Sequence, residues 1–292
     1  METSRKRRTI VNLLIIVVSL AQVLRAQDIM LHGNIGVVRA KTPHTTLQQS
    51  RNLKLWSDVG RELYFSTATN NYLFFREFDL RNLTNSYKLA IVGDSTASTN
   101  GGWASGLQNY VRTNISLLHL AYPWQSSTRF IKSERFTTLK AEKPNYLFIQ
   151  FGLMDSRVCG GEIEECYTSL DQFEKNILYI ISICRGMECV PVLVTPPSLN
   201  YFTNGKVGRW HSDRRNIILK IGGDQDLLVI DLNTKTMDLF NKLGESKSSS
   251  LNWPNDSIHF SQFGANIIAG LVAEEFPKEL LNYAVEPFFS AE

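Results

Sequence analysis

Three residues of this chain have the types and the spacing that nucleophilic catalysis requires. Ser95 follows the apolar run KLAIVG in the sequence GDST, and Asp256 and His259 stand three residues apart in NDSIHF. At that spacing the carboxylate can reach one ring nitrogen of the histidine and fix its tautomer, so the other nitrogen can accept the serine proton. The pattern predicts a Ser-His-Asp triad with Ser95 as the nucleophile.

Each half of this pattern has a simpler explanation when it is taken alone. A serine after Gly-Asp can be a turn residue or a helix N-cap, and a histidine near a helix start is often a capping or surface residue. The two halves together favour catalysis, because they supply the nucleophile and the oriented base of one reaction.

The elements that would position these residues are strands alternating with helices. Four apolar runs, too short for helices, predict buried parallel strands: KLAIVGDST (88–96), NYLFIQFG (145–152), CVPVLVTPP (189–197) and DLLVIDL (226–232). Helical spacing predicts one helix over 169–186 and a closing helix from Ser261 through 284, and SKSSS (246–250) predicts a short flexible loop. This alternation predicts a three-layer α/β/α sandwich with a parallel sheet, whose site lies at the carboxyl ends of the strands.

Residues 27–86 form a different kind of segment, which we interpret as a small β-rich N-terminal leader. It is rich in Thr, Asn and aromatic residues, and the runs ELYFSTA and YLFFREFDL are candidate strands between Asn-rich turns. Two roles remain open for the leader. Its aromatic side chains can pack against the main domain, or they can stack on sugars.

The composition and the first 26 residues limit the classes of protein to which the chain can belong. With 292 residues, 43% hydrophobic and 20% charged, the chain is typical of a globular protein with one main core. The formal charge of +3, without a basic stripe, argues against nucleic acid as a partner. The basic run 5–8, the apolar stretch 10–24 and the small residues after it predict a signal peptide over 1–26, cleaved after Ala21 or Ala26.

A membrane anchor is the alternative reading of this segment, but it is short for a span of about 20 residues. We therefore expect a secreted monomer without stable membrane insertion. The N-x-[ST] sequons at Asn82, Asn114 and Asn255 are candidate glycan acceptors in a eukaryotic host.

The four cysteines are compatible with two disulfides of short loop length. Local pairing would join Cys159 to Cys166 and Cys184 to Cys189, although spacing alone does not fix the connectivity. A zinc site is the competing interpretation. No histidine lies among the four cysteines and neither pair has the C-x-x-C spacing, so we predict no metal site.

Four sequence blocks resemble those of the SGNH (GDSL-like) hydrolases, most closely the rhamnogalacturonan acetylesterase branch. The blocks are GDSTAS (93–98), FGLMD (151–155), LVTPP (193–197) and DSIHFSQFGA (256–265), and the similarity runs from about residue 88 to 276 of a domain over 87–292. The resemblance implies a flavodoxin-like fold in which Ser95 is the nucleophile, His259 the general base and Asp256 its orienting carboxylate. It also implies an O-acetyl ester on a plant cell-wall or related polysaccharide as substrate, and the triad needs no cofactor.

Two departures from the family pattern concern the oxyanion hole. The family places Gly in its second block and Asn in its third, where their amides join the N–H of the nucleophile. Here Trp124 takes the Gly position and Met154 the Asn position. A tryptophan keeps its backbone N–H, whereas a methionine side chain donates no hydrogen bond.

Loss of one oxyanion donor typically lowers turnover by a factor on the order of 100 to 1,000. Two functions therefore remain open: a carbohydrate esterase with a weakened oxyanion hole, and an attenuated pseudo-hydrolase that binds carbohydrate or a partner. Hydrolysis of lipid or thioester and sugar O-acetyl transfer are further alternatives.

Overall fold

The computed structural model describes two compact units, 1–84 with 284–292, and 85–283. In the first unit it describes the strands within 29–79, and in the second it describes residues 85–157 and 167–281. The predicted signal peptide (1–26), the sequon at Asn82 and the cysteines Cys159 and Cys166 lie outside the described residues.

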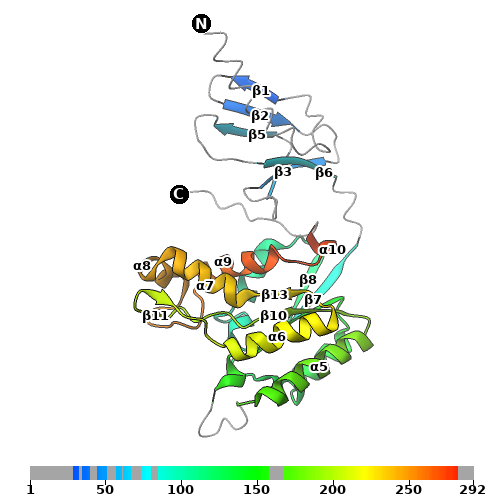
Figure 1. Cartoon of the computed structure of the whole chain (residues 1–292). Coiled ribbons are helices and arrows are strands. Elements are labelled where there is room, and N and C mark those ends of the chain that lie inside the picture. Colours follow the sequence, from blue (N-terminus) through cyan, green and yellow to red (C-terminus); the bar gives the residue numbers. More distant parts are fainter. Residues whose placement is uncertain are drawn as a thin grey trace. The chain divides into compact units, whose positions relative to one another are not determined.

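The first unit contains two antiparallel sheets of three strands each (Figure 1). One sheet has the order β1-β2-β5, and the other has the order β4-β3-β6. The bounds are β1 Ile29–His32, β2 Ile35–Arg39, β3 Thr45–Ser50, β4 Ser57–Gly60, β5 Glu62–Ser66 and β6 Phe74–Asp79. The predicted strand runs ELYFSTA and YLFFREFDL coincide with β5 and β6.

The second unit is built on a five-stranded parallel sheet with the order β13-β10-β9-β7-β8. The strands are β7 Tyr87–Gly93, β8 Ile115–His119, β9 Tyr146–Gln150, β10 Val190–Val194 and β13 Val229–Ile230. Numbered by their order along the chain, they run 2-1-3-4-5 across the sheet, which is the flavodoxin-like arrangement. Four of these strands were predicted from the sequence, but β8, an edge strand whose side chains are partly exposed, was not.

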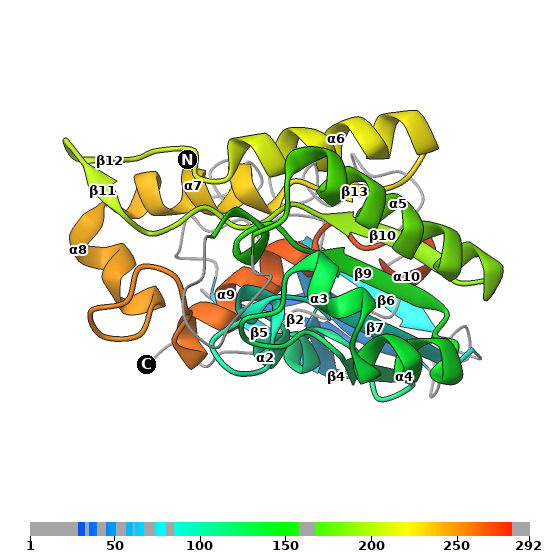
Figure 2. The ribbon, with the colours of Figure 1, turned by 90° about the horizontal axis from the view of Figure 1, so that it is seen from below.

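Helices cover both faces of this sheet, as alternate side chains of β7 indicate. Ala90 and Val92 share a buried cluster with Phe173 and Ile177 of α5 (Leu170–Gly186), and this cluster also takes in residues of α3 (Ser127–Ile131), α4 (Glu134–Glu142) and α6 (Ser212–Gln225). On the other side lie α2 (Ala104–Leu107), α7 (Leu232–Leu243) and α9 (Gln262–Ala273), where α9 packs on α2 and α7 (Figures 1 and 2). The predicted three-layer α/β/α sandwich is therefore confirmed.

The helix boundaries follow their caps and breakers. Ser169 caps α5 by accepting a hydrogen bond from the backbone N–H of Gln172, and the helix ends at Gly186 as predicted. The closing helix differs from its prediction. It ends at Ala273, and a separate short helix, α10, occupies Lys278–Leu281. Pro277 lies between them, and a proline lacks the N–H that a continuing helix needs and disfavours helical geometry in the residue before it.

The run SKSSS is also not the predicted loop. The structure has α8 (Glu245–Ser248) followed by the 3-10 turn η5 (Ser249–Leu251). The hydroxyls of Ser248, Ser249 and Ser250 each donate to a backbone carbonyl three residues earlier, which supports the helical turns. Within 85–157 and 167–281, no helix is both long enough and apolar enough to cross a lipid bilayer.

Candidate active site

Ser95 is held in a tight turn at the carboxyl end of β7. It begins the 3-10 turn η2 (Ser95–Ala97), and the Asp94 side chain caps this turn by accepting from the Thr96 N–H at 3.0 Å and from its hydroxyl at 2.7 Å. Gly93 is required by close packing, because a Cβ there would lie 2.2 Å from the Gln150 carbonyl oxygen of β9. Gly93 therefore lets β7 lie close to β9. The turn that follows it places Ser95 at the carboxyl edge of the sheet.

The three residues that the sequence singled out meet in one hydrogen-bonded line. His259 Nε2 lies 3.0 Å from Ser95 Oγ, and His259 Nδ1 lies 2.7 Å from Asp256 Oδ2. The Asp256–His259 contact is local, whereas Ser95 and His259 are 164 positions apart in the chain. With Nδ1–H donating to the carboxylate, Nε2 can accept the serine proton.

Hydrogen bonds keep the Asp256 carboxyl charged. Partial burial acts to raise its pKa, but hydrogen bonds from the backbone and ring of His259 and from the Ile258 N–H outweigh burial and hold the pKa below its usual value. The indole of Trp253 stacks on the His259 ring, with centroids 5.2 Å apart and an interplanar angle of 30°. The imidazole is thus fixed at its edge by a carboxylate and at its face by an aromatic ring.

The backbone N–H groups that could hold an oxyanion are available. Within the described part of the chain, neither Ser95 nor Trp124 donates its backbone N–H to another group. Trp124 has φ of 61°, in the left-handed region that glycine enters at little cost and that costs another residue about 1–2 kcal/mol. The family's preference for glycine at this position thus has a conformational reason, and Trp124 adopts the same conformation.

Met154 occupies the third oxyanion position without supplying a donor. It is 3% exposed and opens the 3-10 turn η4 (Met154–Ser156), where Leu199 and Ile258 pack against it. A small pocket of about 60 Å³ lies over Ser95. Its lining residues are Ser95, Pro123, Trp124, Leu153, Met154, Arg157, Ile258 and His259. The pocket therefore brings together the predicted nucleophile, the predicted base and both departures from the family pattern.

Behind this pocket, a buried polar network fixes the turn η4. Asp155 accepts from the Ser127 N–H at 3.0 Å and from the Ser127 hydroxyl at 2.5 Å, and burial raises the pKa of Asp155 to about 6. Ser156 Oγ lies 3.2 Å from His211 Nδ1, and burial lowers the pKa of His211 to about 4. Ser127 and His211 were not predicted from the sequence, because neither stands in a motif with the residue that it contacts.

The remaining predictions concern the cysteines, the glycosylation sequons and a metal site. Cys184 and Cys189 are buried free thiols here, and the Cys184 thiol donates to the Cys189 carbonyl oxygen at 3.2 Å, so their disulfide stays a prediction. Asn255 is exposed, whereas the Asn114 amide donates to the Asn85 carbonyl oxygen. Across residues 85–157 and 167–281, no three His, Cys, Asp or Glu side chains gather in a way that could hold a metal ion.

Comparison with known proteins gives relatives over about two thirds of the chain. No protein-family model matches it. A probable rhamnogalacturonan acetylesterase of Bacillus subtilis is 28% identical over 63% of this chain and 89% of its own length. A second rhamnogalacturonan acetylesterase of the same organism is 26% identical over 63% of this chain and 87% of its own length.

Solved structures share the fold. The YxiM protein of Bacillus subtilis matches with a TM-score of 0.55 at 18% identity, over 84% of this chain and 81% of its own. An acetylxylan esterase from Geobacillus stearothermophilus matches with a TM-score of 0.52 at 18% identity, over 65% of this chain and 94% of its own. The resemblance stated from the sequence, and the SGNH-type fold that it implied, are confirmed by these relatives and structures.

Proposed function

We propose that the protein is a secreted serine esterase that removes O-acetyl groups from a carbohydrate, with Ser95 as nucleophile, His259 as general base and Asp256 as its orienting carboxylate. The single observation that carries the proposal is the hydrogen-bonded line from Asp256 through His259 to Ser95, with distances of 2.7 and 3.0 Å. Secretion rests on the signal-peptide pattern of residues 1–26.

The reaction follows from where the protons lie. His259 Nε2 takes the hydroxyl proton as Ser95 Oγ attacks the acetyl carbonyl carbon, and the carbonyl oxygen becomes an oxyanion. When this intermediate collapses, the bond to the sugar oxygen breaks and that oxygen takes the proton from His259. A water molecule then gives a proton to His259 and attacks the acetyl-enzyme. Acetate leaves, and Ser95 regains its proton.

The oxyanion would be held by backbone donors without a side-chain amide. The N–H groups of Ser95 and Trp124 are available for it, and Met154 adds none. Because donors aimed at developing charge are among the strongest contributions to catalysis, such a site turns over more slowly than one with a full set. This supports an esterase with a weakened oxyanion hole.

The choice of acyl group and substrate rests on the pocket and the relatives. The pocket above Ser95 is small, about 60 Å³, and its wall is largely apolar, which suits an acetyl group better than a long acyl chain. The relatives at 28% and 26% identity are described as rhamnogalacturonan acetylesterases. Together they support a carbohydrate acetyl ester over a lipid ester.

One specific observation favours a second function, that of an attenuated pseudo-hydrolase which binds acetylated polysaccharide. Met154 is buried in the wall of the pocket where an amide donor would stand, and Trp124 is 49% exposed at its rim. A site of this kind could keep its fold and its cleft while turnover is lost.

Hydrolysis of an activated acetyl ester by the purified mature protein tests the proposal. Wild-type protein should release acetate, and Ser95→Ala and His259→Ala should not. A serine-directed organophosphate should label Ser95 and abolish turnover. Equal rates from wild type and Ser95→Ala would overturn the enzymatic proposal and leave the binding function.

A further inference from the structure

A second pocket lies outside the catalytic one, at the hairpin formed by β11 (Phe202–Thr203) and β12 (Lys206–Val207). The hairpin stands at the periphery of its unit near α8 in both views (Figures 1 and 2). The pocket has a volume of about 540 Å³. It is lined by Tyr201, Thr203, Lys206, Val207, Gly208, Arg209 and Trp210.

Two aromatic rings form one corner of this hairpin pocket. Tyr201 and Trp210 lie edge to face, with centroids 5.9 Å apart and an interplanar angle of 78°. Tyr201 remains 54% exposed and Trp210 39% exposed. Contact with a partner would bury large apolar ring surfaces on both side chains, which is energetically favourable. Exposed ring faces beside polar groups are the surface on which the apolar face of a pyranose ring can stack.

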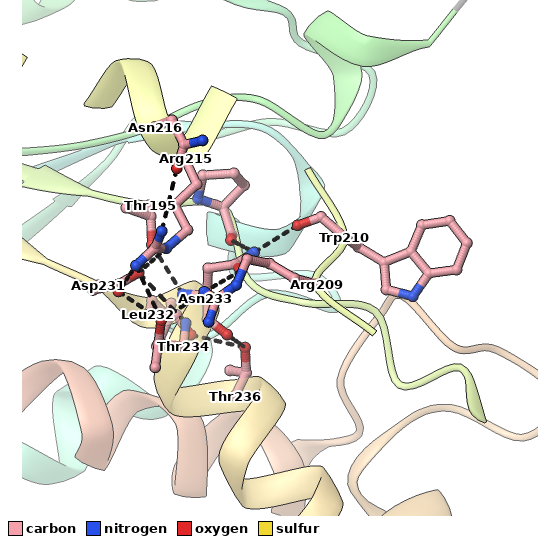
Figure 3. Close-up of polar contacts among 11 residues, drawn as sticks. Thr195, Arg209, Trp210, Arg215, Asn216, Asp231, Leu232, Asn233, Thr234 and Thr236 are labelled. Atoms are coloured by element: carbon pink, nitrogen blue, oxygen red, sulfur yellow. Dashed lines mark hydrogen bonds and ion pairs between the residues drawn. The ribbon is translucent and has the colours of Figure 1, made fainter. Parts of the chain in front are cut away.

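The hairpin pocket is positively charged and its charge is not neutralised by its surroundings. Lys206 and Arg209 are among its lining residues, and none of the seven is a carboxylate. Arg209 donates to Thr234 Oγ1 at 2.8 Å and to Asn233 Oδ1 at 3.4 Å, which are neutral oxygens (Figure 3). Among the described residues Lys206 makes no ion pair. A ligand carboxylate would supply the missing partner for both cations.

The base of the hairpin pocket is rigidly held, so binding there would require little ordering. Asn233 is fully buried and donates to the carbonyl oxygens of Trp210 at 2.8 Å and of Pro196 at 2.9 Å. Figure 3 shows the Trp210 indole pointing away from this network. Ser198 Oγ donates to the Gly208 carbonyl oxygen at 2.9 Å. A preformed site of this kind loses less conformational entropy when it binds.

Both edges of the hairpin pocket connect to the wall of the catalytic pocket. The Asn200 N–H, one residue before Tyr201, donates to the Ser257 carbonyl oxygen at 2.8 Å, and Ser257 is flanked by Asp256 and Ile258. On the other edge His211, directly after Trp210, contacts Ser156 at 3.2 Å in the turn that begins with Met154. Hydrogen bonds therefore link the walls of the two pockets on both sides of the hairpin.

We propose that the hairpin pocket is a sugar subsite that binds a uronic acid unit of the polysaccharide whose acetyl ester lies at Ser95. Tyr201 and Trp210 stack on the sugar ring, and Lys206 and Arg209 bind its carboxylate. That the ligand is a polysaccharide rests on the proposed function, whereas its acidic character follows from the charges of the hairpin pocket. The subsite would select acidic over neutral acetylated chains without taking part in the chemistry.

Direct binding tests the subsite apart from catalysis. Calorimetry on the full chain carrying Ser95→Ala would use a hexamer of galacturonic acid, and the same hexamer with its carboxyl groups reduced to alcohols. The acidic hexamer should bind, and more weakly as salt is raised. The reduced hexamer should bind about 10-fold more weakly. Lys206→Gln should weaken binding about 3- to 5-fold, and Trp210→Ala about 10- to 30-fold.

Lys140→Gln is the matched control, because it removes the same charge from an exposed position on α4, which contributes no residue to the hairpin pocket. Equal binding of the two hexamers, no binding of the acidic one, or wild-type affinity in Lys206→Gln and Trp210→Ala would overturn the subsite. Hydrolysis of a small acetyl ester, measured with Ser95 present, should be unchanged in Lys140→Gln. If no variant or wild type hydrolyses it while binding still depends on Lys206 and Trp210, the esterase proposal fails and the subsite stands.

Discussion

Met154→Asn should raise turnover, because it restores a side-chain donor at the oxyanion position. Met154 lines the same pocket as Ser95 and His259, so an amide there would stand beside the developing negative charge. One such donor changes turnover by a factor on the order of 100 to 1,000, and a donor without optimised support should recover part of it, about 10- to 100-fold. The gain should appear in kcat with KM little changed, since the bond strengthens mainly in the transition state.

The same substitution should lower stability. Met154 is 3% exposed and packs with Leu153, Leu199 and Ile258. Truncation of a buried methionine to alanine costs about 2–5 kcal/mol, and asparagine keeps some volume but brings a polar group into an apolar contact. We expect the free energy of unfolding to fall by about 2–3 kcal/mol. Kinetics should therefore be measured well below the unfolding midpoint of the variant.

Steady-state hydrolysis of an activated acetyl ester measures the effect, with the active enzyme counted by organophosphate labelling at Ser95. Met154→Leu is the control, because it keeps an apolar side chain of similar size and adds no donor. A rise in kcat of the same size in Met154→Leu would mean that space, and not the amide, limits turnover. An unchanged kcat in a folded Met154→Asn protein whose Ser95 still reacts would refute the oxyanion argument. Inactivity equal to Ser95→Ala with retained polysaccharide binding would favour the pseudo-hydrolase.

Three further outcomes are expected. Asp256→Asn should lower kcat about 10³- to 10⁴-fold without loss of fold, as measured by ester hydrolysis and circular dichroism, because the carboxylate no longer fixes the His259 tautomer; a loss below tenfold would contradict its role. Trp253→Ala should lower kcat about 3- to 10-fold and Trp253→Phe should retain most of it, because stacking on His259 limits ring motion; equal losses would show that stacking is irrelevant. Burial raises the pKa of Asp155 to about 6, above the usual carboxyl value of 3.8, so its contribution to wild-type stability is present below about pH 4 and lost as pH rises through 6. The stability of Asp155→Asn relative to wild type should thus increase by about 2 kcal/mol between pH 4 and pH 7 in urea unfolding, and a pH-independent difference would contradict this assignment.

The local parts of the fold were predictable from the sequence. The strand runs around Ala90, Leu147 and Val192 are short and apolar and end in turn residues. This is the pattern of parallel strands that are buried on both faces of a sheet. The helix over 169–186 follows from its apolar spacing, its Ser169 cap and its terminal glycine. The strand at 115–119 escaped prediction because it lies at the edge of the sheet, where partial exposure weakens the apolar signal.

The chemistry of the site was predictable where partners are close in sequence. Asp256 and His259 are three residues apart, so their contact needs only a turn, and the identity of Ser95 follows from the Gly-Asp-Ser after a buried strand. The expectation of an attenuated oxyanion hole likewise needs only the side chains at 124 and 154. Sequence could not predict that Trp124 adopts the left-handed conformation, because that depends on how its loop packs.

The tertiary structure decided what lies far apart in the chain. The order of strands across the sheet brings Ser95 to His259 over 164 positions, and it joins Ser127 to Asp155 and His211 to Ser156. The hairpin pocket depends on such contacts too, since buried Asn233 fixes the loop that presents Trp210. Apolar periodicity and local spacing determined the identity of the elements and of the chemical groups, because these depend on neighbours within a few residues. Long-range packing, which no local pattern encodes, brings those groups together in a hydrogen-bonded line and in a charged aromatic pocket.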